Sequence, residues 1–123
     1  MLVYQELSYE VIGAARNVYV TLGHGFLERA YSDAMCIELR ERGISFVQEQ
    51  PVSIVYHGET LPHGFVADIV VERKIILELK AVKSIEAVHK AQLLNYMKAT
   101  GIRVGYVINF GAPHFEYERL ITG

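Results

Sequence analysis

The chain has 123 residues, of which 51% are hydrophobic and 21% are charged, and its formal net charge is -2. This length suits one domain with a proper hydrophobic core, so we expect residues 1–123 to form a single domain. The low net charge argues against a protein that holds nucleic acid by a strongly basic surface. A locally basic cleft assisted by bound metal is not excluded.

The single cysteine, Cys36, rules out intramolecular disulfides and thiolate metal clusters, and its helical context favours a small buried thiol. The five histidines show no zinc-ligand spacing and fall mostly in turns, so no zinc site is expected. The N-terminus lacks the features of a signal peptide, and no apolar run approaches the length of a membrane span. We therefore expect a cytoplasmic protein.

Two helices are predicted first along the chain. Ser8 is suited to cap a helix over residues 9–22, which the Gly23-His24-Gly25 segment interrupts. A second helix is expected over residues 27–42, ending at Gly43. A strand over residues 52–56 then follows, because apolar side chains alternate there.

The next two predicted strands contain Asp68 and Glu78 and form an antiparallel meander with the first. Ser84 opens a third helix over residues 85–100. A buried strand over residues 104–110 and an edge strand over residues 114–121 complete the chain. The order ααβββαββ predicts an α/β (α+β) domain with a mixed β-sheet flanked by helices.

Asp68, Glu78 and Lys80 form the pattern D-x9-E-x-K across two adjacent predicted strands. Glu78 lies in an apolar stretch typical of a strand covered on both faces, where an unpaired carboxylate is expensive. A three-residue turn at 72–74 would pair Val71 with Ile75 and place Asp68 opposite Glu78. Like charges in that position destabilise a sheet.

Three explanations of this arrangement remain open: a bridging cation, a protonated carboxyl, or a two-residue turn at 73–74 that pairs Asp68 with Leu79 instead. A hard divalent cation is the simplest of them, with Lys80 beside a metal-bound water. A structural ion pair of Lys80 with Asp68 or Glu78 is the competing interpretation of the whole triplet.

Two further polar positions have ordinary structural explanations. Glu28 falls in the first turn of the second predicted helix, where the helix dipole favours a carboxylate. Gln92 and Tyr96 are four residues apart and share a helix face with His89, as half-exposed surface residues often do.

Gly25, Glu28 and Tyr31 form a G-x-x-E-x-x-Y pattern, which residues 65–68, 77–82, 91–96 and 107–111 follow in order. With this combination, the chain resembles the GxxExxY family of the PD-(D/E)XK nuclease superfamily from about residue 9 to residue 120. Ala67 stands where the superfamily's name has proline. The single cysteine also distinguishes the chain from the related Cas4 nucleases, which hold an iron-sulfur cluster.

The resemblance implies a restriction-endonuclease-like core in which Asp68, Glu78 and the Leu79 backbone carbonyl bind Mg²⁺ or Mn²⁺. It implies that Lys80 orients or activates the attacking water and that Glu28 is an additional metal ligand. Gln92 and Tyr96 are similar to the Q-x-x-x-Y element of RecB-like nucleases. These two residues, together with Tyr31 of the G-x-x-E-x-x-Y pattern, are then expected to support the site or contact nucleic acid.

The implied function is metal-dependent hydrolysis of phosphodiester bonds, with DNA as the expected substrate and a homodimer as a possible assembly. A binding module for nucleic acid or protein that keeps the nuclease fold without turnover is the alternative. The low net charge and the lack of a basic stripe on any predicted helix favour that alternative. Hydrolysis of a small phosphorylated molecule is a weaker third possibility.

Overall fold

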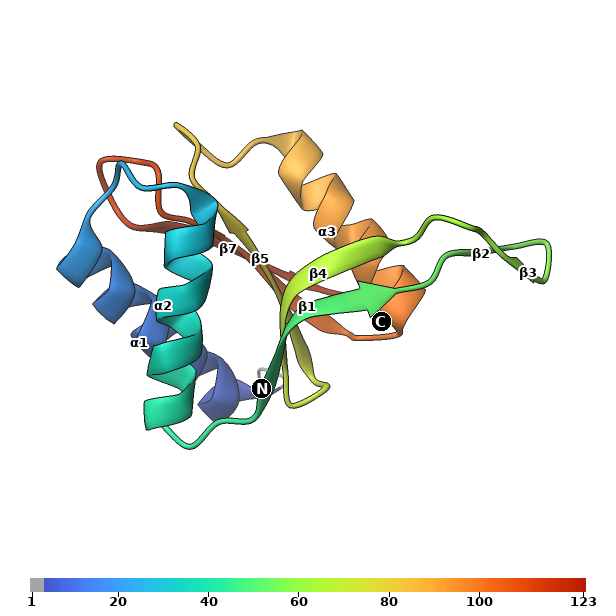
Figure 1. Cartoon of the computed structure of the whole chain (residues 1–123), viewed down its shortest axis with the longest axis horizontal. Helices are drawn as coiled ribbons and strands as arrows, with labels where there is room; N and C mark the ends of the chain where they lie inside the picture. Colours follow the sequence, from blue (N-terminus) through green and yellow to red (C-terminus); the bar gives the residue numbers. More distant parts are fainter. Residues whose placement is uncertain (1–3) are drawn as a thin grey trace.

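The computed structural model describes residues 4–123, and its centre is a five-stranded mixed sheet in the order β1-β4-β5-β6-β7 (Figure 1). β5 and β6 run parallel, and the other neighbouring strands run antiparallel. The strands of this sheet are β1 (Phe46–Val52), β4 (Phe65–Val71), β5 (Ile75–Lys80), β6 (Val104–Asn109) and β7 (Glu116–Ile121).

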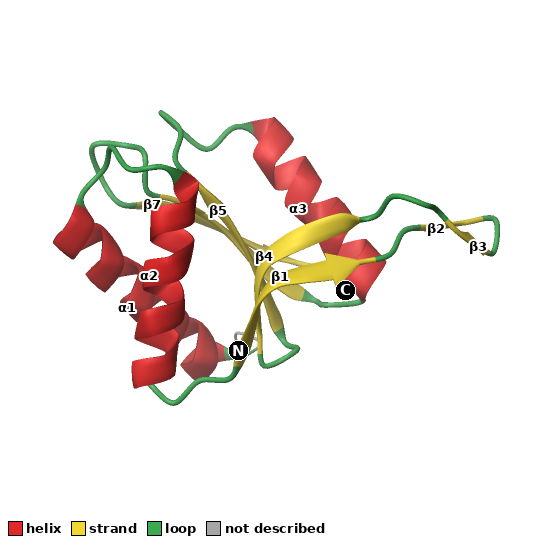
Figure 2. Ribbon diagram, in the orientation of Figure 1, coloured by secondary structure: helices red, strands yellow, loops and turns green. Residues whose placement is uncertain are grey.

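Helices cover both faces of this sheet (Figure 2). α1 (Gln5–Leu22) and α2 (Glu28–Glu41) pack on one face over the larger core cluster, which includes Tyr31, Leu77 and Phe110. α3 (Ala87–Thr100) covers the other face over a smaller cluster that includes Ala67 and Leu93. The predicted fold class and the element order of the main sheet are confirmed. Alternate side chains of the strands fill a core on each side of the sheet.

A small two-stranded arm interrupts the predicted order. β2 (Val55–Tyr56) pairs with β3 (Glu59–Thr60), and the arm projects away from the sheet between β1 and β4 (Figure 1). The predicted strand over residues 52–56 is therefore wrong, since the sheet strand ends at Val52 and begins at Phe46. Pro51 and three polar residues obscured β1, which tolerates a proline because it is an edge strand.

Two predicted helix starts also differ from the structure. Ser8 does not cap α1 but lies buried within it, and the helix begins at Gln5. α3 begins after Glu86, whose side chain forms a reciprocal capping box with His89, so Ser84 lies outside the helix. Within residues 4–123, no helix combines the length and the apolar character needed to cross a membrane.

The predicted turn between β4 and β5 is confirmed. Val71 pairs with Ile75 across a three-residue turn, and the same register continues to the pair Ile69 and Leu77. The ladder ends there, one residue before Asp68 would face Glu78. The two-residue turn that would have separated the acidic residues is excluded.

Gly111 fixes the chain that leaves β5. A Cβ atom at Gly111 would overlap the backbone of Ala81 and Val82, directly after Lys80. We predict that Gly111→Ala lowers the free energy of unfolding by about 1–3 kcal/mol because backbone atoms must move. Gly13→Ala is the control: it lies inside α1, meets only the flexible end of Arg42, and is expected to be neutral or slightly stabilising. Urea unfolding of both variants measures the difference, and equal stabilities would contradict the packing argument.

Candidate active site

The site begins where β4 and β5 separate. Beyond Ile69 and Leu77 no β4–β5 backbone pair continues the ladder. The Leu79 N–H instead donates a hydrogen bond of 2.8 Å to the Asp68 carboxylate oxygen Oδ2. A side chain thus replaces a strand partner, and the backbones of β4 and β5 are no longer paired toward the C-terminal end of β5.

β4 changes the direction of its side chains at this point. Ile69 and Val71 belong to the core cluster under α1 and α2, whereas Phe65 and Ala67 belong to the cluster under α3. Residues two apart in a regular strand share a face, so the strand must rotate across Asp68. On β1, Glu49 lies between the residues paired with Ile69 and Ala67 and has a left-handed φ of 56°. Such backbone strain often accompanies functional sites.

Glu78 is the buried acid of the site. Glu78 is only 5% exposed, and its Oε1 atom has no hydrogen-bond partner. Burial raises the pKa of Glu78 to about 8, with a further increase from the Asp68 charge and an opposing effect of Lys80. A carboxylate with an unpartnered oxygen at this depth needs a proton or a cation.

The pKa of Asp68 is also raised, chiefly by burial, while the Leu79 N–H lowers it. The negative charge of Glu28 contributes to the raised pKa of both Asp68 and Glu78, which places the start of α2 beside these two strands. The structure brings together Asp68 and Glu78, as the sequence indicated. Glu28 is exposed, and its charge acts on these two acids without its side chain joining them.

Lys80 lies at the end of β5, where it is half-buried. Its ammonium Nζ donates a hydrogen bond of 3.4 Å to Gln92 Oε1, and Gln92 Nε2 donates one of 2.7 Å to the Tyr96 hydroxyl. These contacts connect the polar face of α3 to the site. The charge of Glu78 contributes, after burial, to a raised pKa of the Tyr96 phenol.

Tyr31 is fully buried and supports the loop before Glu28. Its hydroxyl donates a 2.6 Å hydrogen bond to the Gly23 carbonyl and accepts one of 3.1 Å from the Phe26 N–H. The ring stacks on Phe110 with centroids 4.6 Å apart. Tyr31 thus fixes the entry into α2 from inside the core and presents no surface to a ligand.

Sequence reasoning missed Asn109, which organises the chain after Lys80. Its buried side chain accepts hydrogen bonds from the backbone N–H groups of Val82 and Gly111, both 3.0 Å, and donates to the Val82 carbonyl at 2.9 Å. It also donates to Glu116, which accepts the Ile85 N–H at 2.7 Å. An asparagine at the end of an apolar strand, two residues before a glycine, was the available signal.

The acidic pair matches part of what a divalent ion requires. Asp68 and Glu78 offer carboxylate oxygens, and the Leu79 carbonyl faces the β4 side because the N–H and C=O of one strand residue point the same way. Within residues 4–123, no three His, Cys, Asp or Glu side chains converge closely enough to hold an ion by themselves. Such an ion would need water or substrate oxygens to complete its coordination, as Mg²⁺ commonly does.

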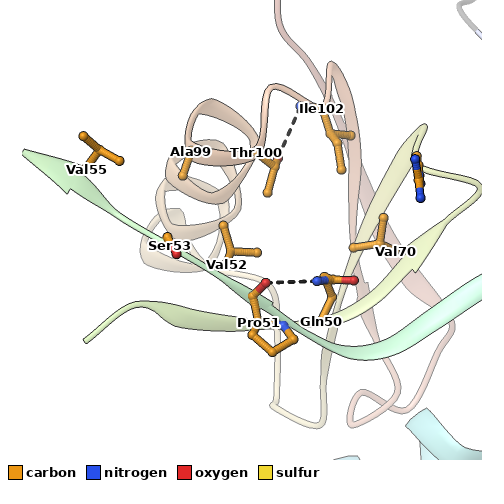
Figure 3. A pocket seen from close by; sticks show the side chains of 10 residues that line it. Gln50, Pro51, Val52, Ser53, Val55, Val70, Ala99, Thr100 and Ile102 are labelled. Carbon is orange, nitrogen blue, oxygen red and sulfur yellow. Dashed lines mark hydrogen bonds between the residues drawn. The ribbon is translucent and has the colours of Figure 1, made fainter. Parts of the chain in front are cut away.

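A pocket of about 540 Å³ lies elsewhere, between β1 and the end of α3 (Figure 3). It contains none of the acidic residues or lysines discussed above. Its lining is largely aliphatic and includes Val52, Val70, Ala99 and Ile102. Among residues 4–123, we place the candidate site where the β4–β5 ladder ends, because two acidic groups with raised pKa values, Asp68 and Glu78, meet there.

The chain matches the family model of the PD-(D/E)XK nuclease superfamily over residues 5–120 and belongs to that superfamily. Its members are nucleases that generally use divalent metal ions. The finer assignment to the GxxExxY family stays a prediction. A comparison with curated proteins finds no match.

The crystal structure of SSO0001 has a similar fold, with a TM-score of 0.59 and 17% sequence identity. The aligned region covers 76% of this chain and 50% of that protein, so the present chain spans about half of its length. At this identity the similarity establishes the fold alone.

The raised pKa of Glu78 predicts how stability depends on pH. The folded protein holds this proton more tightly than the unfolded chain, so protonated Glu78 contributes its full stabilisation below pH 4.5. This stabilisation is lost as the pH rises to about 8. In metal-free buffer, Glu78→Gln should remove this loss and be more stable than the wild type by roughly 3 kcal/mol at pH 8.5.

Denaturant unfolding between pH 5 and pH 8.5 measures how the free energy of unfolding changes with pH in each protein. Glu118→Gln is the matched control, because it makes the same change at an exposed carboxylate of β7. Parallel pH curves for the wild type and Glu78→Gln would contradict the assignment.

Proposed function

We propose that this protein is a Mg²⁺- or Mn²⁺-dependent nuclease that hydrolyses phosphodiester bonds in DNA. The observation that carries the proposal is the buried carboxylate of Glu78, whose Oε1 atom has no hydrogen-bond partner, beside Asp68 at the point where the β4–β5 ladder ends. Membership of a nuclease superfamily supports the same reaction class. Two desolvated acids side by side destabilise a fold unless a proton or a cation neutralises them, so their presence here favours a functional role.

Asp68 and Glu78 would hold the ion, together with the backbone carbonyl of Leu79, the residue directly after Glu78. A bound divalent ion would supply neutralisation of phosphate charge and a more acidic water. Asp68 keeps its orientation through the Leu79 N–H, so one of its oxygens remains free for a ligand. Glu78 offers Oε1, which has no protein partner.

Lys80 is proposed to hold the attacking water and to place positive charge beside the phosphate. Its side chain leaves the same face of β5 as Glu78, because the two residues are two positions apart. Gln92 limits the positions of the Lys80 ammonium, and Tyr96 in turn holds Gln92. Fixed orientation of this kind accounts for much of the rate in such reactions.

Glu28 is proposed as an additional ligand, bound through water or after its exposed side chain turns inward. Tyr31 would support Glu28 by fixing the preceding loop. Gln92 and Tyr96 lie where they would support the site and border the nucleic acid. The expected cytoplasmic location and a homodimer stay predictions.

The first test combines metal binding and hydrolysis. Calorimetric titration of Mn²⁺ in the presence of a short DNA duplex with a frayed end should show binding to the wild type and none to Glu78→Gln. Lys80→Ala should still bind Mn²⁺ but hydrolyse the DNA about 10²–10⁴-fold more slowly, because it removes a proton-handling group and not a ligand.

Glu118→Gln and Lys98→Ala are the controls, since they change exposed residues of the same types. Unchanged Mn²⁺-dependent cleavage in both site variants would contradict the mechanism. DNA binding without metal binding or hydrolysis in the wild type would instead favour the non-catalytic binding module, which the net charge of -2 makes the second candidate.

Glu28 has a smaller expected effect. Glu28→Gln removes a charge from the start of α2 but leaves Asp68 and Glu78 in place, so Mn²⁺ affinity should fall by about 10- to 100-fold. Competition with a fluorescent chelator measures this change. Exposed Glu41 at the end of the same helix provides the control variant Glu41→Gln. Equal losses in the two variants would point to long-range charge and not to a ligand.

A further inference from the structure

We propose that Phe65 is a positioning residue for the Lys80 ammonium group, acting through the ring of Tyr96 and the amide of Gln92. The inference rests on the proposed function, because Lys80 is assigned there to the attacking water. Phe65 carries no polar group and does not belong to the acidic cluster. It would influence the reaction by holding the ring of Tyr96, whose hydroxyl in turn orients the Gln92 amide.

The ring contact between Phe65 and Tyr96 is the first step of the argument. Phe65 is the first residue of β4, and Tyr96 lies in the third turn of α3. Their rings are nearly parallel, with centroids 3.8 Å apart and planes inclined by 8°. Both residues are half-buried, so the stack closes one side of the smaller core cluster. One face of the Tyr96 ring is therefore held by a residue from another element.

The second step is the polar chain from Tyr96 to Lys80. The Tyr96 hydroxyl accepts the 2.7 Å hydrogen bond from Gln92, whose carbonyl oxygen faces Lys80 Nζ at 3.4 Å. Gln92 is exposed, and within residues 4–123 its amide forms no other hydrogen bond. The orientation of the amide, and with it the acceptor offered to Lys80, thus depends on where the Tyr96 hydroxyl lies.

The third step is the anchoring of Phe65 itself. Phe65 pairs with Val52 at the end of β1, and the preceding Gly64 lies against the same residue. A Cβ atom at Gly64 would overlap the Val52 carbonyl oxygen. The start of β4 is therefore held against β1, three residues before Asp68. Phe65 connects this fixed backbone to the face of α3 that carries Gln92.

Kinetics of Phe65 variants test the proposal. Phe65→Leu and Phe65→Met keep an apolar side chain but remove the stacked ring, so kcat should fall by about 10- to 100-fold with little change in KM. Phe65→Tyr keeps the stack and should retain the wild-type kcat. Two non-aromatic variants are used so that the test survives if one fails to fold, which thermal unfolding detects. A wild-type kcat in a folded non-aromatic variant would overturn the proposal.

A double-mutant cycle separates positioning from a general loss of packing. Tyr96→Phe keeps the ring but removes the hydroxyl that orients Gln92, so Phe65→Leu should have no further effect on kcat in that background. Multiplied effects of the two substitutions would mean that Phe65 acts by another route. Tyr56→Leu is the matched control: it removes a ring stacked on His57, 4.2 Å away in the projecting arm, and should leave kcat unchanged.

Nuclear magnetic resonance provides a readout that does not depend on activity. Phe65→Leu should shift the side-chain amide resonances of Gln92 toward those of a free glutamine, whereas Phe65→Tyr and Tyr56→Leu should not. An inactive wild type with this shift would refute the proposed function but keep the structural connection. An active wild type whose Gln92 resonances are unmoved by Phe65→Leu would refute the connection alone.

Discussion

The hydrogen bond between the Leu79 N–H and the Asp68 carboxylate is the constraint on which the site depends. It lies where the β4–β5 ladder ends, and it satisfies a backbone donor that a longer ladder would have used. Without this side-chain acceptor, the strands would have to continue pairing or leave the donor unsatisfied. Continued pairing would bring a regular strand across Glu78. The ladder therefore ends beside Glu78, where Asp68 serves both as the hydrogen-bond partner of Leu79 and as a candidate ligand.

The opposite side of β5 is held without any such break. All six residues of β5 pair in parallel with β6, and the Phe110 N–H extends this pairing to the Lys80 carbonyl at 2.8 Å. Asn109 then secures Val82 through both its backbone groups. Glu78 and Lys80 consequently project from a part of β5 that is paired with β6 on one side and unpaired with β4 on the other. This asymmetry fits a site that must hold its own groups still while admitting a ligand.

Much of this arrangement follows from local sequence patterns. The apolar run of β5 indicated the burial of Glu78. The three-residue turn predicted the correct β4–β5 register, because the length of a turn determines which residues of the two strands lie opposite each other. Helical spacing predicted that Gln92 and Tyr96 share a helix face, and the structure joins them by a hydrogen bond. The position of β1 did not follow, since Pro51 and neighbouring polar residues conceal an edge strand. Contacts such as that of Phe65 with Tyr96 join elements distant in sequence, so no local pattern specifies them.

The same carboxylates impose opposite demands on the folded protein as pH changes. Burial raises the pKa of both Asp68 and Glu78, so the metal-free fold is favoured where they carry protons. A hard cation competes with those protons for the same oxygens, and its binding would release them. At low pH both carboxyl groups carry protons, and the metal-free protein is stable. At higher pH the site is charged and needs a cation for its stability. Lys80 cannot substitute for that cation, because its effect on Glu78 is smaller than those of burial and Asp68.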